Sequence, residues 1–559
     1  MSEGRSDIFQ GSKMSHPKLR LGILLDSFDV PAWVFAVIQR IRKDGFGEIV
    51  LVGLNDGMDG RSGRDWSTFV YSAFHRMDER LFGRSPNPFE VKDAADLLAG
   101  VPVIGLHPSA QDGRQYLSDA DLASIKKSEL DILLRFGCEN LQVERVNAST
   151  YGTWFYCHGD DRLQREGPPG FWETVDYWPE TTSALLATGG KFSSTRVLFR
   201  SHFVTYPLSP ARHRSYYFWA AVPFLPRQIE RLYRLGEAEF FRDIEAFNAA
   251  PAPHINRYTI PTNAAAAKGI LKLVGRWIKE FVQRVLTFDQ WFLSFSLEQD
   301  VADGAAGFVK LQPPKGLFWA DPHIVEVDAK FYIFIEEFSE AKNKGHISVI
   351  EMDAHGDCKP PVKILEKEYH LSYPFVFEQD GTFYMVPESR ANRTIDLYEC
   401  VEFPYRWNFK QTLMENVSAV DTTLLRHAGK WWMFTALAEI EAAAPNVELF
   451  LFYTDDIFRG KWTPHPRSPI ISDVKRARPA GSFFLRDGKL FRPSQDCSHA
   501  YGYGFDLNEV ELLSETEYRE RRVTSIRPDW DRKILGTHTY ARCGNLTVID
   551  ALRRISKLG

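Results

Sequence analysis

Cysteine is scarce in this sequence, and long apolar runs are missing. Only six of 559 residues are cysteines (Cys138, Cys157, Cys358, Cys400, Cys497 and Cys543), and no two of them form a CxxC pair. This spacing argues against a zinc ribbon and against a small disulfide-stapled secreted domain. No stretch approaches 18 uninterrupted apolar residues, and residues 1–18 lack the apolar segment of a signal peptide. We therefore expect reduced thiols, a disordered tail over 1–18 and a cytoplasmic location.

An excess of positive charge is also missing. The formal net charge is -5, and no basic stripe alternates with aromatic residues on the scale that nucleic-acid binding needs. We expect no nucleic-acid partner, and the sequence offers no metal-binding motif. What the chain does have is a 14% content of aromatic residues, which suits both packed strands and the apolar faces of sugar rings.

A repeated unit fills the C-terminal half. Each unit starts with a polar or charged residue at the head of an apolar strand, and continues through a turn into a strand rich in aromatic residues. The five starts are Trp319-Ala320-Asp321-Pro322, Ser372-Tyr373-Pro374, Val420-Asp421-Thr422-Thr423, Ala477-Arg478-Pro479 and Gly536-Thr537-His538-Thr539. A period of roughly 40–50 residues with several short strands is typical of a β-propeller. We predict a five-bladed, all-β propeller over residues 305–559.

The start of each unit is a candidate site. The innermost strand of a propeller blade begins at the central channel, so residues far apart in the sequence should meet there. Several carboxylates around one channel are what glycosyl chemistry requires, because one acts as an acid and another as a base or nucleophile. We predict Asp321, Glu388 and Asp421 as catalytic acids. The predicted sugar-binding residues are Trp319, Tyr373, Arg478, Arg492, Gln495, Asp496 and His538. The alternative is that these acids fasten neighbouring blades.

The N-terminal half reads as alternating strands and helices. Strands are predicted at Leu21–Leu25, Ile49–Leu54 and Val101–Ile104, with a helix over Trp33–Ile41. This order indicates a parallel α/β sheet over residues 19–235, whose ligands would lie beyond the carboxyl ends of the strands.

Two stretches of this half carry a resemblance. Leu130 to Gly137 resembles the strand before the active site of formyltransferases that use 10-formyltetrahydrofolate, and His158 with Arg165-Glu166-Gly167-Pro168-Pro169 resembles their His and Arg-Gly-x-x-Pro loop. The resemblance covers roughly residues 19–215. It implies a catalytic His158 with Tyr156, Asp160 and Arg165 around it, and 10-formyltetrahydrofolate as a cofactor. Tyr156 stands where the family has an amide donor, and Ser193 stands where it has an aspartate.

A helical connector is predicted over residues 236–304. Within it, residues 264–286 place apolar side chains on one side of a helix and basic side chains on the other. We expect this helix to pack against a neighbouring domain. Peripheral contact with a membrane through 264–286 is the alternative.

The propeller half also carries a resemblance. The Trp-Ala-Asp-Pro start is similar to five-bladed glycosidases and fructosyltransferases of the arabinanase and levansucrase type. The segments His370–Pro374, Pro387-Glu388-Ser389, Ala477–Gly481, Arg492–Ser498 and Gly536–Thr539 resemble the N-terminal domain of plant glucosamine inositolphosphorylceramide transferases. Bacterial proteins that join such a domain to a formyltransferase-like domain look similar along nearly the whole chain.

These resemblances imply a carbohydrate-active protein of glycan or glycolipid biosynthesis. Its propeller would bind a sugar, nucleotide-sugar or glycolipid precursor and carry out glycosyl transfer or glycoside hydrolase-like cleavage. Two alternatives stay open. The protein is an N-formyltransferase acting on an amino sugar, or it is a non-catalytic glycan-binding scaffold.

Overall fold

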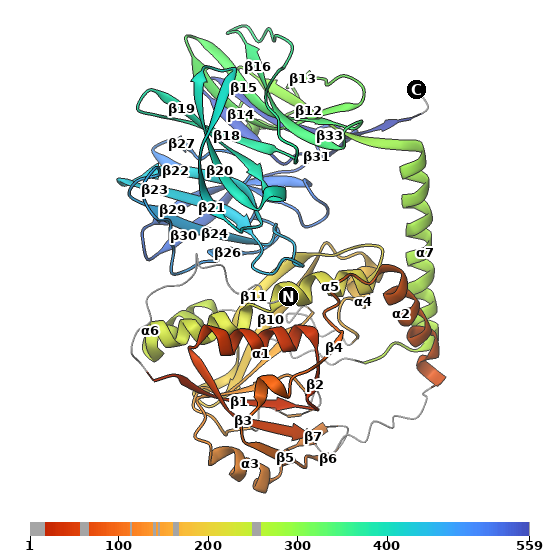
Figure 1. Cartoon of the computed structure of the whole chain (residues 1–559). Helices are drawn as coiled ribbons and strands as arrows, with labels where there is room; N and C mark the ends of the chain where they lie inside the picture. The colour runs from red at the N-terminus through yellow and green to blue at the C-terminus, as the bar shows by residue number, and fades with distance from the viewer. Residues whose placement is uncertain are drawn as a thin grey trace. The chain divides into compact units, whose positions relative to one another are not determined.

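The computed structural model divides the chain into two compact units, with the boundary after residue 276. It describes residues 17–55, 66–111, 114–137, 141–142, 146–159, 167–248 and 259–557 (Figure 1). Of the expected tail over 1–18, only residues 17 and 18 are described. The candidate residues Asp160 and Arg165 lie outside the described ranges.

The first unit is built on a seven-stranded sheet with the order β11-β10-β9-β8-β1-β3-β5. Neighbours among β5, β3, β1, β8 and β9 run parallel, whereas β9, β10 and β11 run antiparallel. The strands are β1 (Leu19–Leu25), β3 (Gly47–Asn55), β5 (Val103–Leu106), β8 (Ile132–Arg135), β9 (Thr153–His158), β10 (Glu180–Gly189) and β11 (Phe192–Val204). An α/β sheet is present as predicted, although its last two strands depart from the parallel arrangement.

Helices and two small ribbons complete this unit. The helices are α1 (Ala32–Asp44), α2 (Phe69–Phe82), α3 (Asp119–Lys126), α4 (Phe171–Asp176), α5 (Pro210–Ala221) and α6 (Phe224–Phe247), and the ribbons pair β2 (Asp29–Pro31) with β4 (Val91–Asp93) and β6 (Ser109–Gln111) with β7 (Arg114–Tyr116). Apolar side chains of the central strands, such as Leu24, Leu133 and Phe155, form one core cluster with Ile125 of α3. Helix α1 instead contacts α6 and β3.

The second unit is a five-bladed β-propeller, as the repeat predicted. Its blades 1 to 4 are consecutive antiparallel sheets. Blade 1 holds β14 (Leu317–Val327), β15 (Lys330–Ser339), β16 (Lys344–Met352) and β17 (Val362–Leu365). Blade 2 holds β18 (Ser372–Gln379), β19 (Thr382–Ser389), β20 (Thr394–Glu402) and β21 (Arg406–Glu415).

Blades 3 and 4 follow the same order. Blade 3 holds β22 (Ala419–His427), β23 (Lys430–Leu437), β24 (Glu448–Thr454), β25 (Thr463–Pro464) and β26 (Ile471–Ser472). Blade 4 holds β27 (Phe484–Arg486), β28 (Lys489–Asp496), β29 (Gly504–Leu513) and β30 (Tyr518–Ile526). Short 3₁₀ turns elsewhere in the chain cover Trp66–Thr68, Asp96–Leu98, Val301–Asp303 and Arg390–Asn392.

Blade 5 joins strands from both ends of the unit. It holds β12 (Thr287–Ser296), β13 (Val309–Leu311), β31 (Ile534–Gly536), β32 (Tyr540–Cys543) and β33 (Leu546–Ser556). Strand β12 pairs with β33 from Thr287 opposite Ser556 to Ser296 opposite Thr547, and this ladder closes the ring. Residues 287–296 were expected in the connector. The structure puts them in the propeller, because an apolar strand at the N-terminal end of the ring supplies an edge for the last strand to pair with.

The turn between the first two strands explains the regular glycine of the repeat. In blades 2, 3 and 4 this turn is Asp380-Gly381, Ala428-Gly429 and Asp487-Gly488, and both residues of each pair have a positive φ. Two consecutive residues with positive φ form the tight turn that matches the twist of a two-strand hairpin, and glycine adopts this conformation without steric cost. Blade 1 uses Asp328-Ala329 for the same turn.

Helix α7 (Asn263–Leu286) leads from the first unit into β12. It buries only Ala266, Gly269 and Leu273, which lie in its N-terminal half. The larger apolar side chains beyond them are exposed, among them Ile278 and Phe281. Within the first unit its small residues make the contact and its large ones do not, and the expected packing of this helix against a neighbouring domain stays a prediction.

Candidate active site

The innermost strands of blades 1, 2 and 3 share one backbone irregularity. Asp321, Tyr373 and Asp421 have φ values of 53°, 42° and 50°, in the left-handed region that residues other than glycine rarely adopt. At each position the pairing with the next strand shifts register, between Ala320 and His323 in blade 1 and at the matching sites of the other two blades. Such bulges re-aim a side chain, and strained backbone of this kind clusters at functional sites.

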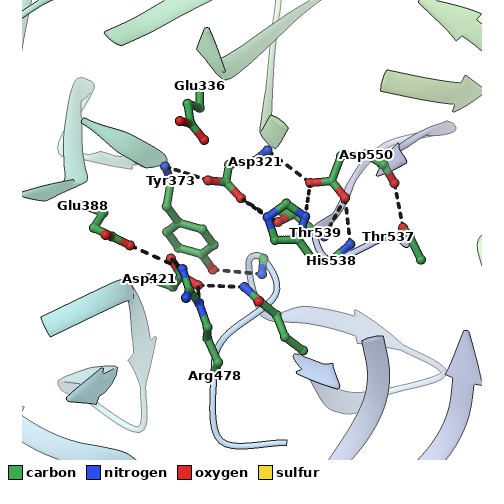
Figure 2. A network of polar contacts seen from close by, with 12 residues as sticks. Asp321, Glu336, Tyr373, Glu388, Asp421, Arg478, Thr537, His538, Thr539 and Asp550 are labelled. Atoms are coloured by element: carbon green, nitrogen blue, oxygen red, sulfur yellow. Dashed lines mark hydrogen bonds and ion pairs between the residues drawn. The ribbon is translucent and has the colours of Figure 1, made fainter. Parts of the chain in front are cut away.

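The carboxylate of Asp321 links three blades (Figure 2). It accepts hydrogen bonds from the backbone N–H of Tyr373 at 3.2 Å and from the Thr539 hydroxyl at 2.9 Å. The Nε2 atom of His538 lies 3.3 Å from the same carboxylate. Asp321 is 3% exposed, so this acid is a junction of blades 1, 2 and 5 as well as a candidate for chemistry.

Asp550, which the sequence did not single out, supports this junction from β33. Its carboxylate accepts the backbone N–H groups of Asp321 at 3.2 Å, His538 at 2.8 Å and Thr539 at 3.0 Å. The Nδ1 atom of His538 lies 2.7 Å from it. The available signal was a lone aspartate within the apolar run Thr547-Val548-Ile549-Asp550-Ala551.

A second group of charges surrounds Asp421. Arg478 donates to its carboxylate from Nε at 2.5 Å and from the terminal nitrogen at 3.1 Å, and Gln495 donates from its amide at 2.7 Å. The same guanidinium lies 3.6 Å from the carboxyl of Glu388 on β19. One arginine therefore stands between an acid of blade 2 and an acid of blade 3 (Figure 2).

Tyr373 ties three blades together through its hydroxyl. The hydroxyl accepts the backbone N–H of Gly481 at 2.8 Å and shares a hydrogen bond of 2.8 Å with Thr423. Tyr373 is fully buried. The structure thus brings together all five residues that start the repeats, since Asp321 contacts Tyr373 and His538, and the Tyr373 hydroxyl reaches the blade that carries Asp421.

Burial sets the protonation states of the acids in this centre. It raises the pKa of Glu336 on β15 well above its usual range, and the charges of Asp321 and Glu388 add to the effect. Burial also raises the pKa of Glu388 well above its usual range; the neighbouring Asp421 raises it further, while Arg478 opposes the shift. The sequence did not predict Glu336 as a site residue.

Asp321 and His538 form a titrating pair. Burial raises the pKa of Asp321 to about 6, although the neighbouring His538 counteracts it. Burial alone would lower the pKa of His538, but the carboxylates of Asp550 and Asp321 outweigh burial and raise it. The centre therefore offers protonated glutamic acids together with an aspartate that ionises close to neutral pH, which are the two partners of general acid–base catalysis.

The most exposed side of this centre carries Tyr501. Its side chain is 49% exposed. The Arg478 guanidinium lies 4.9 Å from the centre of its ring, and the His538 ring lies 5.3 Å from it. An aromatic ring beside an arginine and two acids is a suitable surface for a sugar, because sugar rings stack on aromatic faces and their hydroxyls bond to charged groups.

Asp321, His538 and Asp550 offer ligand atoms that lie within 4.8 Å of one another and could hold a metal ion. The chemistry of the donor set fits such an ion poorly. Three backbone N–H groups already donate to Asp550, and a metal ion in contact with the same oxygens would meet this positive side of the peptide dipoles. We read the three as a hydrogen-bonded junction.

Three predicted sugar-binding residues are placed elsewhere. The Trp319 indole donates to Glu337 at 2.8 Å. Arg492 is 1% exposed and pairs with Glu520 at 2.7 Å, and Asp496 pairs with Arg527 at 2.8 Å. Their roles as sugar ligands stay predictions, although each head group is already engaged by a neighbouring strand of its own blade or by the segment that follows it.

His158 of the first unit lies in an aromatic pocket. Its Nδ1 atom shares a hydrogen bond of 2.9 Å with Ser183, and the ring of Phe218 lies 3.9 Å away. Burial lowers the pKa of His158 to about 3. The Tyr156 hydroxyl, which we expected to replace an amide donor, instead donates to the carbonyl of Val222 at 3.4 Å and accepts the N–H of Leu225 at 3.3 Å. The Tyr156 hydroxyl is thus engaged by backbone groups of residues 222 and 225, and its expected oxyanion role stays a prediction.

The propeller residues are similar in sequence to known proteins. The sequence model of the family described as "Glucosamine inositolphosphorylceramide transferase 1, N-terminal" matches residues 309–547. Relatives include glucosamine inositolphosphorylceramide transferase 1 of Arabidopsis thaliana, with 34% identity over 209 residues, or 37% of this chain and 27% of the relative. The protein of the same name from Oryza sativa subsp. japonica is 32% identical over 206 residues, or 36% of this chain and 27% of the relative.

The chain thus spans about a quarter of the length of the curated relatives that it matches. Solved structures with partial likeness include an exo-1,5-alpha-L-arabinanase from a bovine ruminal metagenomic library, at 14% identity and a TM-score of 0.31, covering 44% of this chain and 95% of that one. The beta-xylosidase RS223 has 12% identity and a TM-score of 0.33, and covers 43% of this chain and 92% of its own.

Proposed function

We propose that the propeller centre binds the sugar of a glycan or glycolipid precursor and that the protein acts in the biosynthesis of such molecules by glycosyl transfer or hydrolysis. One observation carries the proposal. Five blades contribute acids, an arginine and a histidine to one buried network, in which the pKa values of Glu336 and Glu388 are raised well above their usual range by burial first of all. The match of residues 309–547 to a family named for a glycolipid transferase supports the substrate class.

The residues divide into roles. Glu388 keeps its proton at neutral pH, so it would donate that proton to the oxygen of the leaving group. Asp321, with a pKa of about 6, would accept a proton from the attacking hydroxyl of water or of an acceptor sugar. Arg478 and Tyr501 would hold the substrate at the exposed side, and Gln495 and Tyr373 fix the position of Arg478 through Asp421 and blade 4.

The partner is proposed as a sugar, nucleotide-sugar or glycolipid precursor. The site of action is proposed as the cytoplasm, where activated sugars are available for biosynthesis. The cysteines among the described residues, Cys157, Cys358, Cys400, Cys497 and Cys543, are free thiols, which supports a reducing compartment. Within the described residues, no helix is long and apolar enough to cross a membrane.

A non-catalytic glycan-binding scaffold is the second candidate, and one observation favours it. The carboxylates of Asp321 and Asp421 are already held by donors from neighbouring blades, so a carboxylate at either place has a structural role. Both acids therefore fasten neighbouring blades, whether or not they also react. Their catalytic use stays a prediction.

N-formylation of an amino sugar stays an untested alternative. The pKa of about 3 keeps His158 neutral, as a base should be, but its buried pocket and the engaged Tyr156 hydroxyl argue against an oxyanion site around it. We expect no release of tetrahydrofolate from 10-formyltetrahydrofolate in the presence of amino sugars. Turnover that disappears in His158→Ala would establish the alternative.

The main test uses the full chain and two matched variants. Thermal shift against nucleotide sugars and glycosylated inositol phosphates identifies a ligand, because a ligand at 100 times its dissociation constant adds about 2.7 kcal/mol of stability. Glu388→Gln should then lower turnover by about 10²–10⁴ at an unchanged melting temperature. Glu399→Gln, in a partly exposed pair with Lys410, is the control. Sugar binding without turnover in the wild type would favour the non-catalytic scaffold. A screen in which no sugar binds would overturn both the enzyme proposal and the scaffold proposal.

A further inference from the structure

Helix α7 carries the densest exposed apolar surface of the described residues. Eight large apolar side chains within 16 residues are exposed: Leu271 at 72%, Val274 at 45%, Trp277 at 38%, Ile278 at 60%, Phe281 at 69%, Val282 at 45%, Val285 at 54% and Leu286 at 42%. A helix advances about 1.5 Å per residue, so this surface is about 24 Å long. We call these eight residues the α7 apolar face.

A different side of the helix makes its contacts within the first unit. Ala266 and Leu273 join a cluster with Phe171 and Val175, and a Cβ atom added at Gly269 would lie 3.2 Å from Val175. Arg276 donates from its guanidinium to the carbonyls of Thr174 and Val175. At 100° per residue, Leu273 and Gly269 lie well away from the middle of the α7 apolar face at Phe281 and Val285. The helix is thus anchored without using that face.

The remaining surface of α7 is basic. The helix contains Lys268, Lys272, Arg276, Lys279 and Arg284 against a single acidic residue, Glu280, in a chain whose overall formal charge is -5. Lys268, Lys272 and Lys279 fall on one flank of the apolar face at helical spacing, where Lys272 pairs with Asp176 at 2.9 Å, and Arg284 falls on the other. A wide apolar face between basic flanks is the pattern of a helix that lies in the plane of an anionic membrane surface.

We propose that α7 docks on an anionic lipid bilayer, with its apolar face among the acyl chains near the head groups and with Lys268 and Lys279 against lipid phosphates. The occupant is a bilayer and not a second copy of this chain, because pairing two such helices would bring two strongly basic flanks together. The inference does not depend on catalysis in the propeller.

The experiment measures binding of the full chain to vesicles. Sedimentation with phosphatidylcholine vesicles that contain about 30% phosphatidylserine should carry the wild type down, whereas pure phosphatidylcholine should carry little. Ile278→Asp combined with Phe281→Asp should lower the vesicle partition coefficient at least tenfold. The control is Leu485→Asp, at a side chain that is 73% exposed on β27, and it should bind as the wild type does. Equal melting temperatures exclude misfolding, because all three side chains are exposed.

The charge is tested separately. Lys268→Glu combined with Lys279→Glu should weaken binding to anionic vesicles at least tenfold, while Lys315→Glu, at an exposed lysine of the propeller, should not. A wild type that ignores anionic vesicles, or apolar variants that still bind them, would overturn the proposal. A wild-type dimer in light scattering that the apolar variant converts to monomers, with no vesicle binding, would assign the face to self-association instead.

Discussion

The two units bury their candidate residues in opposite ways. In the α/β unit, His158 shares a hydrogen bond with Ser183 and lies among the rings of Trp33, Tyr156 and Phe218. In the propeller, Asp321 and His538 lie in a network of carboxylates, hydroxyls and backbone N–H groups drawn from several blades. Burial acts on both sites, and in the second the charged side chains of Asp321, His538 and Asp550 also act on one another.

The difference shows what burial alone achieves. Burial lowers the pKa of His158 to about 3, which removes its charge at any physiological pH. His538 is just as buried, yet its pKa is raised, because the neighbouring carboxylates of Asp550 and Asp321 outweigh burial. A histidine in an apolar pocket stays neutral over the pH range in which enzymes work, whereas a histidine between acids can exchange protons with them.

The largest effect is expected for the acid that organises the propeller network. Asp550→Ala removes the acceptor of three buried N–H groups and the partner of His538, so the propeller should lose about 3–5 kcal/mol of unfolding free energy. Urea unfolding followed by tryptophan fluorescence measures this loss. Asp531→Ala breaks an exposed pair with Lys310 and should cost under about 1 kcal/mol. Equal losses in the two variants would mean that the network is not a junction.

The next largest effect is expected from lowering the pH, which should change the stability contributions of His158 and Asp321 in opposite directions. Unfolded histidine binds a proton below about pH 6.5 but folded His158 does not until about 3, so its contribution to stability is present above pH 6.5 and is lost as the pH falls. By pH 4.5 the loss should reach about 2–3 kcal/mol, and His158→Gln should remove it. The exposed His107→Gln is the control.

Asp321 should show the reverse sign, because its pKa rises from 3.8 to about 6 on folding. Its contribution is present below its ordinary pKa and is lost as the pH rises through 6. Hydrogen exchange of peptides from each unit, followed between pH 7 and 4.5, measures the pH-dependent contributions of His158 and of Asp321 to stability. If Asp321→Asn leaves the pH profile of the propeller unchanged, the sign of this contribution is wrong.

A single hydroxyl should have the next smaller effect. Tyr373→Phe leaves the buried N–H of Gly481 without its acceptor, so the propeller should lose about 1–3 kcal/mol. Tyr405→Phe removes a hydroxyl at an exposed contact with Glu351 and should cost little. The urea midpoints of the two variants show whether the Tyr373 hydroxyl stabilises the propeller. A Tyr373 variant as stable as the Tyr405 variant would count against the link between blades.

The smallest expected effect is a change in the pKa of one acid, Glu388. Asp421→Asn removes a negative charge that raises the pKa of Glu388, and it leaves the charge of Arg478, which opposes that shift, without its counter-ion. Both changes favour ionisation, so the protonated carboxyl band of Glu388 in infrared spectra should disappear at a lower pH than in the wild type. Glu388→Gln identifies the band. A band that stays in place would show that Asp421 does not tune this acid.

The repeat made much of the propeller predictable from sequence. A polar residue at the head of an apolar strand marks the channel end, and this led to Asp321, Tyr373, Asp421, Arg478 and His538, which the structure brings together. The reason is geometric, because the innermost strands of blades 1, 2 and 3 carry the same bulge at the same place. In the first unit, strands and helices were predicted from apolar periodicity, and helix α7 was placed to within one residue at its start.

Partners that lie on later strands could not be predicted in this way. Asp550 lies alone in an apolar strand and Glu336 lies beside Glu337 in another, and nothing in the local pattern shows which way such an acid points. Arg492 and Asp496 have the same kind of setting as Arg478, but Glu520 and Arg527 engage them, and no local spacing indicates that pairing. Amphipathicity likewise predicts that α7 has an apolar face without showing what covers it.

The ladder between β12 and β33 has a consequence for how the protein is made. Its two strands lie at residues 287–296 and 546–556, so the ring cannot close until residue 556 has been synthesised. Until then β12 of blade 5 has one unpaired edge, in a fold already slowed by pairings between distant residues. A nascent propeller of this kind would depend on protection during translation, and its final strand would decide whether it is released as a ring or as an open arc.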